Sequence, residues 1–305
     1  MSIEIRSERP GDEPAIDAVN CRAFGKMDEA NIVRGMRALH PRFDPRFSVI
    51  AWDGDEAVGH ALFTPADIRL MGETVRALAV GPVAVVPEKQ KQGIGGAVLR
   101  FGHELGRQNG FALAFLHGHP DYYPRHGYVA CHGFCKVTVD RDALPEPSQT
   151  LTPWPVTEDD LPWLVERHAV EWADVDFSWQ WGPHPNEWAL CGINAVVWRT
   201  EDGWRVGYSW GKSDCSDWKV VLADGPVGAR DIIATIKPEK LEQHPSGWLA
   251  KNVLDPAWAT AEAKPSAAAM ACPLQDGALD AVAAAVQAGE HPPGFTNFPL
   301  PFIVC

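Results

Sequence analysis

A strand, a glycine-rich turn and a helix follow one another between Val83 and Val98, and this order suits the binding of phosphate groups. The turn reads Gln90-Lys-Gln-Gly-Ile-Gly-Gly96. A helix begins with unpaired backbone N–H groups and the positive end of its dipole, and glycines let the backbone turn sharply and approach a ligand closely. The segment therefore predicts an anion site, most simply one for a pyrophosphate.

Two other phosphate-binding loops do not fit this turn. A Walker A loop needs Gly-Lys-Ser/Thr before its helix, whereas Gly95-Gly96 is followed by Ala97. A dinucleotide fingerprint needs a glycine or alanine where Val98 stands, and an acidic residue after the next strand, where Leu116 is followed by His117. What distinguishes the turn is Gln90-x-x-Gly93-x-Gly95 placed just after a strand.

In these residues the chain resembles the GNAT superfamily of N-acetyltransferases, whose signature is Gln/Arg-x-x-Gly-x-Gly/Ala. The resemblance runs from Ile3 to Val139, and the stretches 60–65, 81–87 and 119–128 are similar to a YhbS-like bacterial subgroup. It implies an α/β (α+β) GNAT fold with a mixed, mostly antiparallel central sheet flanked by helices. It also implies acyl transfer from acetyl-CoA without a metal.

The resemblance implies where acetyl-CoA binds. The backbone of the strand would bond the pantetheine arm in the manner of an added strand, and the main-chain N–H groups of the turn would hold the pyrophosphate. The residues implied for this binding are Val83, Ala84, Val85, Gln90, Lys91, Gln92, Gly93, Ile94, Gly95 and Gly96.

A tyrosine four residues before a Gly-Phe pair commonly serves as the acid in this family. Here the pair is Gly127-Tyr128, with Tyr replacing Phe, and the resemblance implies that Tyr123 is catalytic. A phenol with a free pKa near about 10 roughly matches a thiol and can return a proton to the sulfur of the leaving CoA. The adjacent Tyr122 is a competing candidate, and the alternative for both residues is that they cap the domain core.

The base that takes the proton of the amine has several candidates. Carboxylates, imidazoles and the chain end all qualify by type: Asp28, Glu29, Asp67, Glu73, His117, His119 and the carboxylate of Cys305. His119 is expected beside the cofactor channel and could titrate near neutrality. A water chain to a carboxylate is an equal alternative. His117-x-His119 and the Cys131–Cys135 segment are poor metal candidates, because their spacing provides no further ligand.

Hydrophobic spacing predicts the elements that must position these residues. Strands are expected at Ile3–Arg6, Phe47–Trp52, Ala57–Phe63, Asp67–Val86 (as one interrupted strand), Phe111–Leu116 and Gly133–Val139. Helices are expected at Asp12–Phe24, with Asp12 as a possible N-cap, at Ala30–Leu39 and at Gly93–Asn109.

The chain of 305 residues is long enough for two domains. All of its 13 tryptophans except Trp52 follow residue 150, and the stretch 144–150 is Pro-rich and polar. We therefore expect a GNAT acetyl-CoA-binding catalytic domain at 1–143, a linker at 144–150 and a second α/β domain at 151–305.

The second half echoes the first in its order of elements. A helix at Leu161–Trp172, strands at 195–199, 204–209 and 219–223, and a helix near 229–236 resemble tandem acetyltransferases of the enhanced-intracellular-survival type, with a degenerate second half. Because the Gln-x-x-Gly-x-Gly turn is missing there, this half is predicted to bind no CoA. Its aromatic cluster at 176–184 could line an acceptor pocket or pack the core, and 259–271 is expected to be loop or helix.

Composition excludes some classes of function. A net charge of −13 argues against tracking nucleic-acid phosphates; it is compatible with a cationic amine substrate, or simply keeps the protein soluble. The charged N-terminus lacks an apolar signal region, and no apolar run is long enough for a membrane, so a cytoplasmic location is expected. Seven scattered cysteines then indicate reduced thiols.

These features together predict an enzyme that transfers an acetyl group from acetyl-CoA to a primary amine of a small molecule by direct attack. We expect a monomer or homodimer with no metal, nucleic-acid or membrane partner. The alternatives are transfer from another acyl-CoA or to a protein amine, and a CoA-binding sensor or structural module without turnover.

Overall fold

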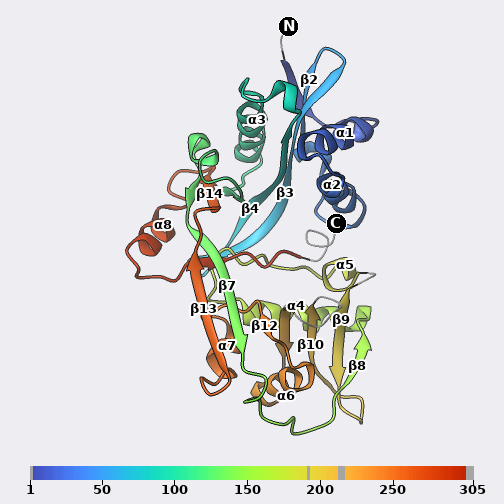
Figure 1. Cartoon of the computed structure of the whole chain (residues 1–305), viewed down its shortest axis with the longest axis vertical. Coiled ribbons are helices and arrows are strands. Elements are labelled where there is room, and N and C mark those ends of the chain that lie inside the picture. Colours follow the sequence, from blue (N-terminus) through green and yellow to red (C-terminus); the bar gives the residue numbers. More distant parts are fainter. Residues whose placement is uncertain (1–2, 191–192, 212–216, 300–305) are drawn as a thin grey trace.

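Two β-sheets lie one above the other along the long axis of the molecule (Figure 1). The structure is a computed structural model that describes residues 3–190, 193–211 and 217–299. Within these ranges the upper sheet is formed mainly by the N-terminal part of the chain and the lower sheet mainly by the rest. None of the helices described is both long and apolar enough to cross a bilayer.

The first sheet has the order β1-β2-β3-β4-β5-β14-β6. Its strands are β1 (Ile3–Ser7), β2 (Ser48–Asp53), β3 (Glu56–Leu70), β4 (Glu73–Val85), β5 (Leu113–His117), β14 (Ala269–Pro273) and β6 (Val129–Ala130). All neighbours are antiparallel except β4 and β5. The interrupted strand expected at Asp67–Val86 is instead the end of β3 and the whole of β4, because Met71 and Gly72 adopt positive φ angles of 50° and 83° and close a hairpin.

Three helices cover this sheet: α1 (Glu13–Phe24), α2 (Asp28–Leu39) and α3 (Ile94–Gln108). Asp12 stands at the N-cap position of α1, but it makes no side-chain cap there. Its carboxylate instead accepts hydrogen bonds from Arg6 and from the Arg9 amide. On α3, Gly102 faces Phe63 so closely that a Cβ would collide with the ring, which explains how the helix approaches the sheet.

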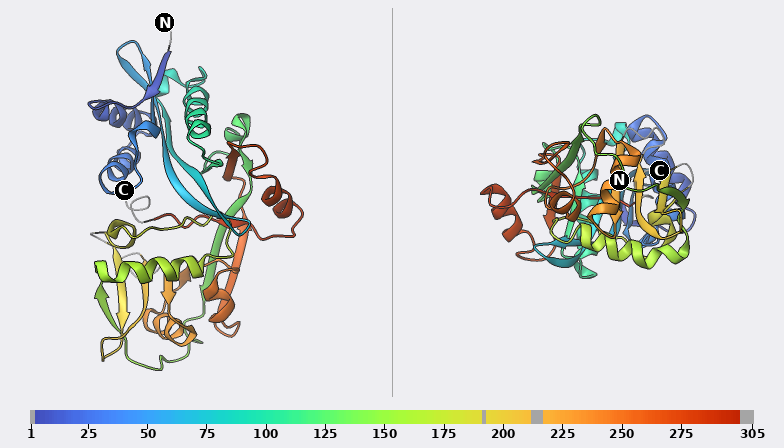
Figure 2. Two further views of the ribbon diagram at one scale, coloured as in Figure 1. Left: turned by 180° about the vertical axis from the view of Figure 1, so that it is seen from behind. Right: turned by 90° about the horizontal axis from the view of Figure 1, so that it is seen from below.

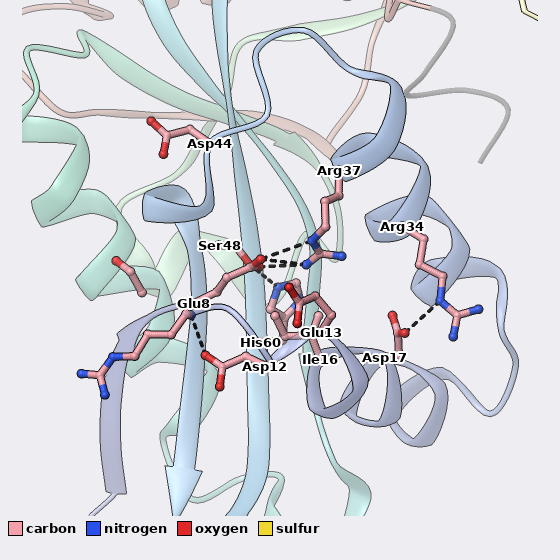
Figure 3. Close-up of polar contacts among 12 residues, drawn as sticks. Glu8, Asp12, Glu13, Ile16, Asp17, Arg34, Arg37, Asp44, Ser48 and His60 are labelled. Carbon is pink, nitrogen blue, oxygen red and sulfur yellow. Dashed lines mark hydrogen bonds and ion pairs between the residues drawn. The ribbon is translucent and has the colours of Figure 1, made fainter.

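Buried and half-buried polar contacts fasten α1 and α2 to the sheet (Figure 3). Arg37 of α2 bonds Glu8 at 2.9 Å. The Ser48 hydroxyl and the Asn20 amide each lie 3.1 Å from a ring nitrogen of His60. This Ser–His–Asn group has the composition of a nucleophile with its base, but all three side chains are fully buried, so its role is structural.

The second sheet has the order β13-β7-β12-β11-β10-β9-β8, with β15 pairing beside β7. Its strands are β7 (His132–Val139), β8 (Thr152–Pro155), β9 (Asn194–Arg199), β10 (Arg205–Gly211), β11 (Asp217–Ala223), β12 (Lys240–Leu241), β13 (Ala259–Pro265) and β15 (Gly294–Phe295). The helices of this half are α4 (Leu161–Glu171), α5 (Pro185–Trp188), α6 (Pro226–Ile236), α7 (Trp248–Asn252) and α8 (Asp280–Gln287), and α4 crosses over the strands (Figure 2). The helices and the hairpin predicted at 161–236 are confirmed.

The two sheets exchange strands. β7 leaves the N-terminal half and pairs with β12 and β13 in the second sheet, while β14 returns from the C-terminal half and pairs with β5 in the first (Figure 1). The expectation of loop or helix at 259–271 was therefore wrong, since this stretch forms β13 and part of β14. The sheets do not divide at 144–150, and the division into 1–143 and 151–305 stays a prediction.

An aromatic layer fills the space where the two halves meet. Residues 176–180 run along the end of β3, with the Phe177 amide donating to the Arg69 carbonyl at 2.8 Å. Phe177, Trp179 and Trp181 are buried in one core cluster with Phe115 of β5. Of the two alternatives for this aromatic segment, the structure therefore supports packing.

The exchange of strands makes the N-terminal half dependent on the C-terminal half. A fragment of residues 1–143 lacks β14, whose Met270 packs in the first core, as does the following Leu274. Losing two such side chains removes about 3–6 kcal/mol and leaves β5 as an unpaired edge. We expect the fragment to aggregate without a cooperative thermal transition in circular dichroism, and to become soluble when co-expressed with residues 144–305. A sharp unfolding transition of the fragment alone would contradict this.

Candidate active site

The strands β4 and β5 run side by side over a short distance and then separate. Their parallel pairing joins Ala77–Ala79 to Leu113–Phe115. Beyond this point β4 continues to Val85 and stays paired with β3, with Val83 opposite Ala61 and Val85 opposite Gly59. The backbone of Val83–Val85 thus has one edge in the sheet and one edge facing the gap to β5, which is suited to an extended ligand that adds as a strand.

The turn predicted to hold phosphate lies directly after this open edge. A short 3-10 helix, η2 (Pro87–Lys89), is followed by Lys91 with φ of 60° and by Gly93 with φ of 84°. The Ala97 amide donates to the Gly93 carbonyl at 3.0 Å and closes the first turn of α3. The amides before Ala97 consequently lie outside the helical hydrogen-bond ladder, at the positive end of the helix dipole.

Two glutamine side chains shape the turn by bonding its own backbone. Gln90 Nε2 donates to the Val85 carbonyl at 3.1 Å, and Gln92 Nε2 donates to the Glu88 carbonyl at 3.1 Å. These bonds connect the end of β4 to the start of α3. The turn is therefore braced from within. The Gln90 amide donates to the Pro87 carbonyl at 3.3 Å, and the main-chain N–H groups after it are the groups left for a ligand.

Aromatic side chains from η3 (Tyr123–His126) and the residue before it cover the start of α3. A Cβ on Gly95 would lie 2.5 Å from the Tyr122 hydroxyl oxygen, and one on Gly96 would lie 2.5 Å from His126 Cε1. The same position on Gly96 is 3.3 Å from a guanidinium nitrogen of Arg100. Both glycines are thus required for close packing, and Arg100 adds positive charge beside the turn.

Substituting Gly95 tests this arrangement. We expect Gly95→Ala to weaken CoA binding at least about 10-fold, because the new methyl group displaces Tyr122 or shifts the helix start, and the loss of a polar contact or two is worth about 1–3 kcal/mol. The dissociation constant and the stoichiometry are measured by titration calorimetry. The control is Gly225→Ala before α6, where a Cβ meets nothing within 4 Å. Equal affinity in the Gly95 variant and wild type would contradict the expectation.

Tyr123 lies beside the end of β5. Its ring packs against Gly118 so closely that a Cβ on that residue would collide with it. The ring centroid is 5.2 Å from that of Tyr122 and 5.5 Å from that of Tyr128. Burial, and to a lesser degree Tyr122, raises the pKa of Tyr123 to about 12, so the phenol is protonated at physiological pH and can act as a donor.

The Tyr128 hydroxyl is engaged elsewhere and is no candidate for the acid. It lies 2.8 Å from His103 Nε2 on α3, and both residues are buried. The shared hydrogen bond ties the segment just after η3 to the middle of α3. Tyr128 thereby fixes the segment that presents Tyr122 and Tyr123 at the strand ends.

The structure separates the candidate bases. Asp28 and Glu29 start α2 and face Lys26 at 2.8 and 3.8 Å, and Asp67 is paired with Arg42 at 2.7 Å. Glu73 is exposed at the tip of the β3–β4 hairpin. His117 ends β5 and is exposed, as is His119 two residues later. Cys305 lies outside the described residues.

The helix that follows β11 in the second half differs from α3 at its start. Pro226 at the first position of α6 lacks an N–H group, and Asp224 places a carboxylate just before it, bonded to the Trp163 indole at 2.6 Å. A negative charge and a missing donor both disfavour a phosphate at this end. The expectation that this half binds no CoA, made from the missing Gln-x-x-Gly-x-Gly turn, stays a prediction, and the start of α6 at Asp224-Gly-Pro226 agrees with it.

Comparison with known proteins adds to this geometry. The family profile described as "Acetyltransferase (GNAT) domain" matches residues 4–131. The uncharacterized N-acetyltransferase YjhQ of Escherichia coli K12 is 38% identical over 40% of this chain and 67% of its own length. The uncharacterized N-acetyltransferase YhbS of the same strain is 30% identical over 42% of this chain and 75% of its own length.

A fold similarity extends over nearly the whole chain. The crystal structure of a GCN5-related N-acetyltransferase from Kribbella flavida matches 91% of this chain and 73% of its own, with a TM-score of 0.70 and 16% sequence identity. At this identity the likeness concerns the fold. It agrees with the mixed α/β fold expected for the first half and with a second half of related architecture.

Proposed function

Because the chain belongs to the GNAT family of N-acetyltransferases, we propose that it transfers the acetyl group of acetyl-CoA to a primary amine of a small molecule by direct attack. The chain is an acyltransferase. The observation that carries the proposal is the separation of β4 from β5, which leads from an open strand edge at Val83–Val85 to the amides at the start of α3.

Each part of acetyl-CoA has a matching feature in this arrangement. The pantetheine arm carries amide groups that can pair with the free edge of Val83–Val85. The pyrophosphate is expected on the main-chain N–H groups of residues 90–96, at the positive end of α3. Arg100, whose guanidinium lies beside Gly96, supplies further positive charge near these phosphates. The thioester would then lie near the end of β5, where Tyr123 packs on Gly118.

Tyr123 is proposed to protonate the leaving sulfur. The amine nitrogen attacks the thioester carbon, the tetrahedral adduct collapses, the C–S bond breaks, and the phenol transfers its proton to the thiolate. A phenol with a pKa of about 12 is a weaker acid than a thiol in water, so it would be poorly matched to the thiolate there. Burial, however, raises thiol pKa values as well. Within this protein, burial raises the pKa of the Cys131 thiol to about 12, so a phenol and a thiol in equally dry surroundings remain matched.

The test is to incubate the full chain with acetyl-CoA and a panel of small amines, and to measure release of free thiol. Acetylation of at least one amine, confirmed by mass spectrometry, supports the proposal. If the chain turns over only with a longer acyl-CoA, the donor would be that acyl-CoA and not acetyl-CoA. Tight CoA binding with no thiol release across the panel would favour a non-catalytic CoA-binding module.

A further inference from the structure

We propose that His117 is the base that takes the proton of the attacking amine, and that His132 is the positioning residue behind it. This rests on the proposed acetyl transfer and adds the group that the mechanism still needs. An amine that has attacked a thioester carries a positive charge on nitrogen, and the adduct collapses to products only when a base removes a proton from that nitrogen.

The position of His117 follows from the alternation of side chains along β5. Leu116 points into the core that contains α3, whereas Phe115 points into the core that contains Trp179. His117 lies on the same side as Phe115, because side chains two residues apart share a face. It therefore faces the meeting of the two halves, at the place where β4 and β5 have separated.

The proposed acid, Tyr123, packs on the residue that follows His117. The residue after His117 is Gly118, and Tyr123 packs on its Cα. The Gly118 amide is held by the Ala268 carbonyl at 2.8 Å, and His117 pairs with Ala269 of β14. One short piece of anchored backbone thus carries the base on one face of the sheet and supports the acid on the face of Leu116. A thioester in the gap between β4 and β5 would then have one proton-transfer group on either side, one for nitrogen and one for sulfur.

Aromatic rings hold the His117 imidazole from several sides. Its centroid is 5.1 Å from that of His132 at an interplanar angle of 30°, 5.2 Å from Phe134 at 68°, and 5.7 Å from Phe298 at 84°. His132 and Phe134 come from β7, and Phe298 comes from the C-terminal segment. The ring retains an exposed edge, so a substrate can reach it while its orientation is restricted.

His132 has the surroundings of a residue that orients another. It is 1% exposed and stacks on Phe177 with centroids 4.7 Å apart. Burial, with a smaller contribution from His117, lowers the pKa of His132 to about 3, although the Met270 backbone lies close enough to oppose the shift. Neither ring nitrogen makes a hydrogen bond of good geometry to a partner among the described residues. His132 therefore stays neutral and acts on His117 by ring packing.

The charge state of His117 suits a base. Burial lowers its pKa below the usual value of 6.5, so the imidazole is neutral and accepts protons at pH 7. The groups that face it from β7 and the C-terminal segment are the neutral His132 and two phenyl rings, and Tyr123 on η3 is protonated. In the proposed step the N–H bond of the adduct breaks and its proton goes to the imidazole. The C–S bond then breaks, and the sulfur takes a proton from Tyr123.

The other candidates lie in less suitable places. Asp67 pairs with Arg76, one residue before the partner of Leu113 at the start of β5, so it lies about 16 Å along the strand from His117 at roughly 3.3 Å per residue. His126 sits over Gly96 on the phosphate side, where Arg100 and Arg125 contribute to lowering its pKa after burial. His119 is exposed, as is His117, and it provides a matched histidine without the ring packing.

The experiment compares His117→Gln with His119→Gln, using the amine that the thiol-release screen identifies. We expect kcat of His117→Gln to fall about 100- to 10,000-fold while its Kd for CoA stays within about two-fold of wild type, because a general base contributes about that much to turnover. The acid limb of kcat/KM seen in wild type should disappear. His117→Ala should regain activity with added imidazole. His119→Gln should match wild type in rate and pH profile.

A second variant separates positioning from catalysis. His132→Gln should bind CoA normally, lose about 10- to 100-fold in kcat through misplacement of His117, and show no rescue by imidazole. An unchanged pH profile and rate in His117→Gln, with active wild type, would overturn the inference and leave the proposed function intact. Wild type that turns over no amine would overturn the proposed function itself.

Discussion

Replacing Tyr123 with phenylalanine is expected to lower kcat about 100- to 1,000-fold while leaving the affinity for acetyl-CoA nearly unchanged. The phenyl ring can keep its packing on Gly118 and Tyr128, so the cofactor channel keeps its shape. Only the hydroxyl is lost, and with it the proton that the leaving thiolate takes; removal of a general acid costs about this factor. The measurement is steady-state release of thiol, with Kd from calorimetry.

Tyr122→Phe is the matched control, because the two tyrosines are adjacent and partly buried. The hydroxyl of Tyr122 lies near Gly95, at the phosphate turn, and the ring of Tyr123 lies at the end of β5. We therefore expect Tyr122→Phe to raise the Kd for CoA a few-fold with a kcat near that of wild type. If Tyr123→Phe kept its full kcat, or if Tyr122→Phe lost more than Tyr123→Phe, the acid would have to be assigned to another group.

The pH dependence of Tyr123 follows from the direction of its shift. Since burial raises its pKa to about 12, the acid form persists through the usual assay range, and a basic limb below about pH 10 should not arise from this residue. The acid limb should instead reflect a group with a pKa below 6.5, which is the behaviour expected of His117. Profiles of wild type and Tyr123→Phe should therefore differ in height and agree in shape.

The parts of this fold that the sequence predicts well are the local ones. The strand, turn and helix from Val83 to Gly96 lie within one short segment, so glycine positions and hydrophobic spacing specify them directly. The hairpin at Asp53–Glu56 and the element order of the second half are similarly local and agree with the structure. In such segments each residue choice agrees with the final structure.

The exchange of strands could not be predicted, because it depends on contacts between distant parts of the chain. Ala269–Pro273 is rich in alanine and has little preference for strand on its own, and it becomes a strand because it pairs with β5. The strand expected at Gly133–Val139 agrees with β7 in position, yet nothing in its alternation indicates which sheet it joins. Strand propensity describes a pleated, half-buried surface and carries no information on the partner.

The candidate site was predicted in the same uneven way. Tyr123 and the glycine turn follow from local motifs, whereas the pairing of His117 with His132 requires β7 to cross to the second sheet. His132 lies between Cys131 and Cys135, a segment whose spacing indicates only a poor metal site. The alternation of β7 did contain a signal, since His132 stands two residues before Phe134 and shares its face, and both rings contact His117.

Lowering the pH from 7.5 to 5.0 is expected to reduce the free energy of unfolding by about 7 kcal/mol, enough to unfold a domain of ordinary stability. The cause is a set of buried histidines whose pKa values burial lowers to about 3 or 4. They are His40, His60, His103, His132 and His168. Each is kept neutral in the folded protein but takes up a proton near pH 6.5 when unfolded.

The sign and size follow from proton linkage. A lowered histidine pKa does not change the free energy of unfolding well above pH 6.5. Below that pH it reduces the free energy of unfolding by about 1.4 kcal/mol per pH unit, until the pKa of the folded state is reached. Five such groups cost about 10 kcal/mol at pH 5.0. Glu171 acts in the opposite direction, because burial raises its pKa to about 8, and lowering the pH removes a cost of about 3 kcal/mol. The difference, about 7 kcal/mol, is the loss in the free energy of unfolding expected from these six groups.

Urea unfolding followed by tryptophan fluorescence at pH 7.5 and 5.0 measures this loss. His168→Gln should reduce the pH dependence by about 2 kcal/mol, because one of the five groups no longer takes up a proton on unfolding, and glutamine can still bond Asn297, which lies 2.8 Å from His168 Nε2. His119→Gln, at an exposed site, should leave the dependence unchanged. Equal stability at the two pH values would mean that these imidazoles are protonated in the folded protein. His132 could not then be the neutral ring on which the proposed orientation of His117 depends.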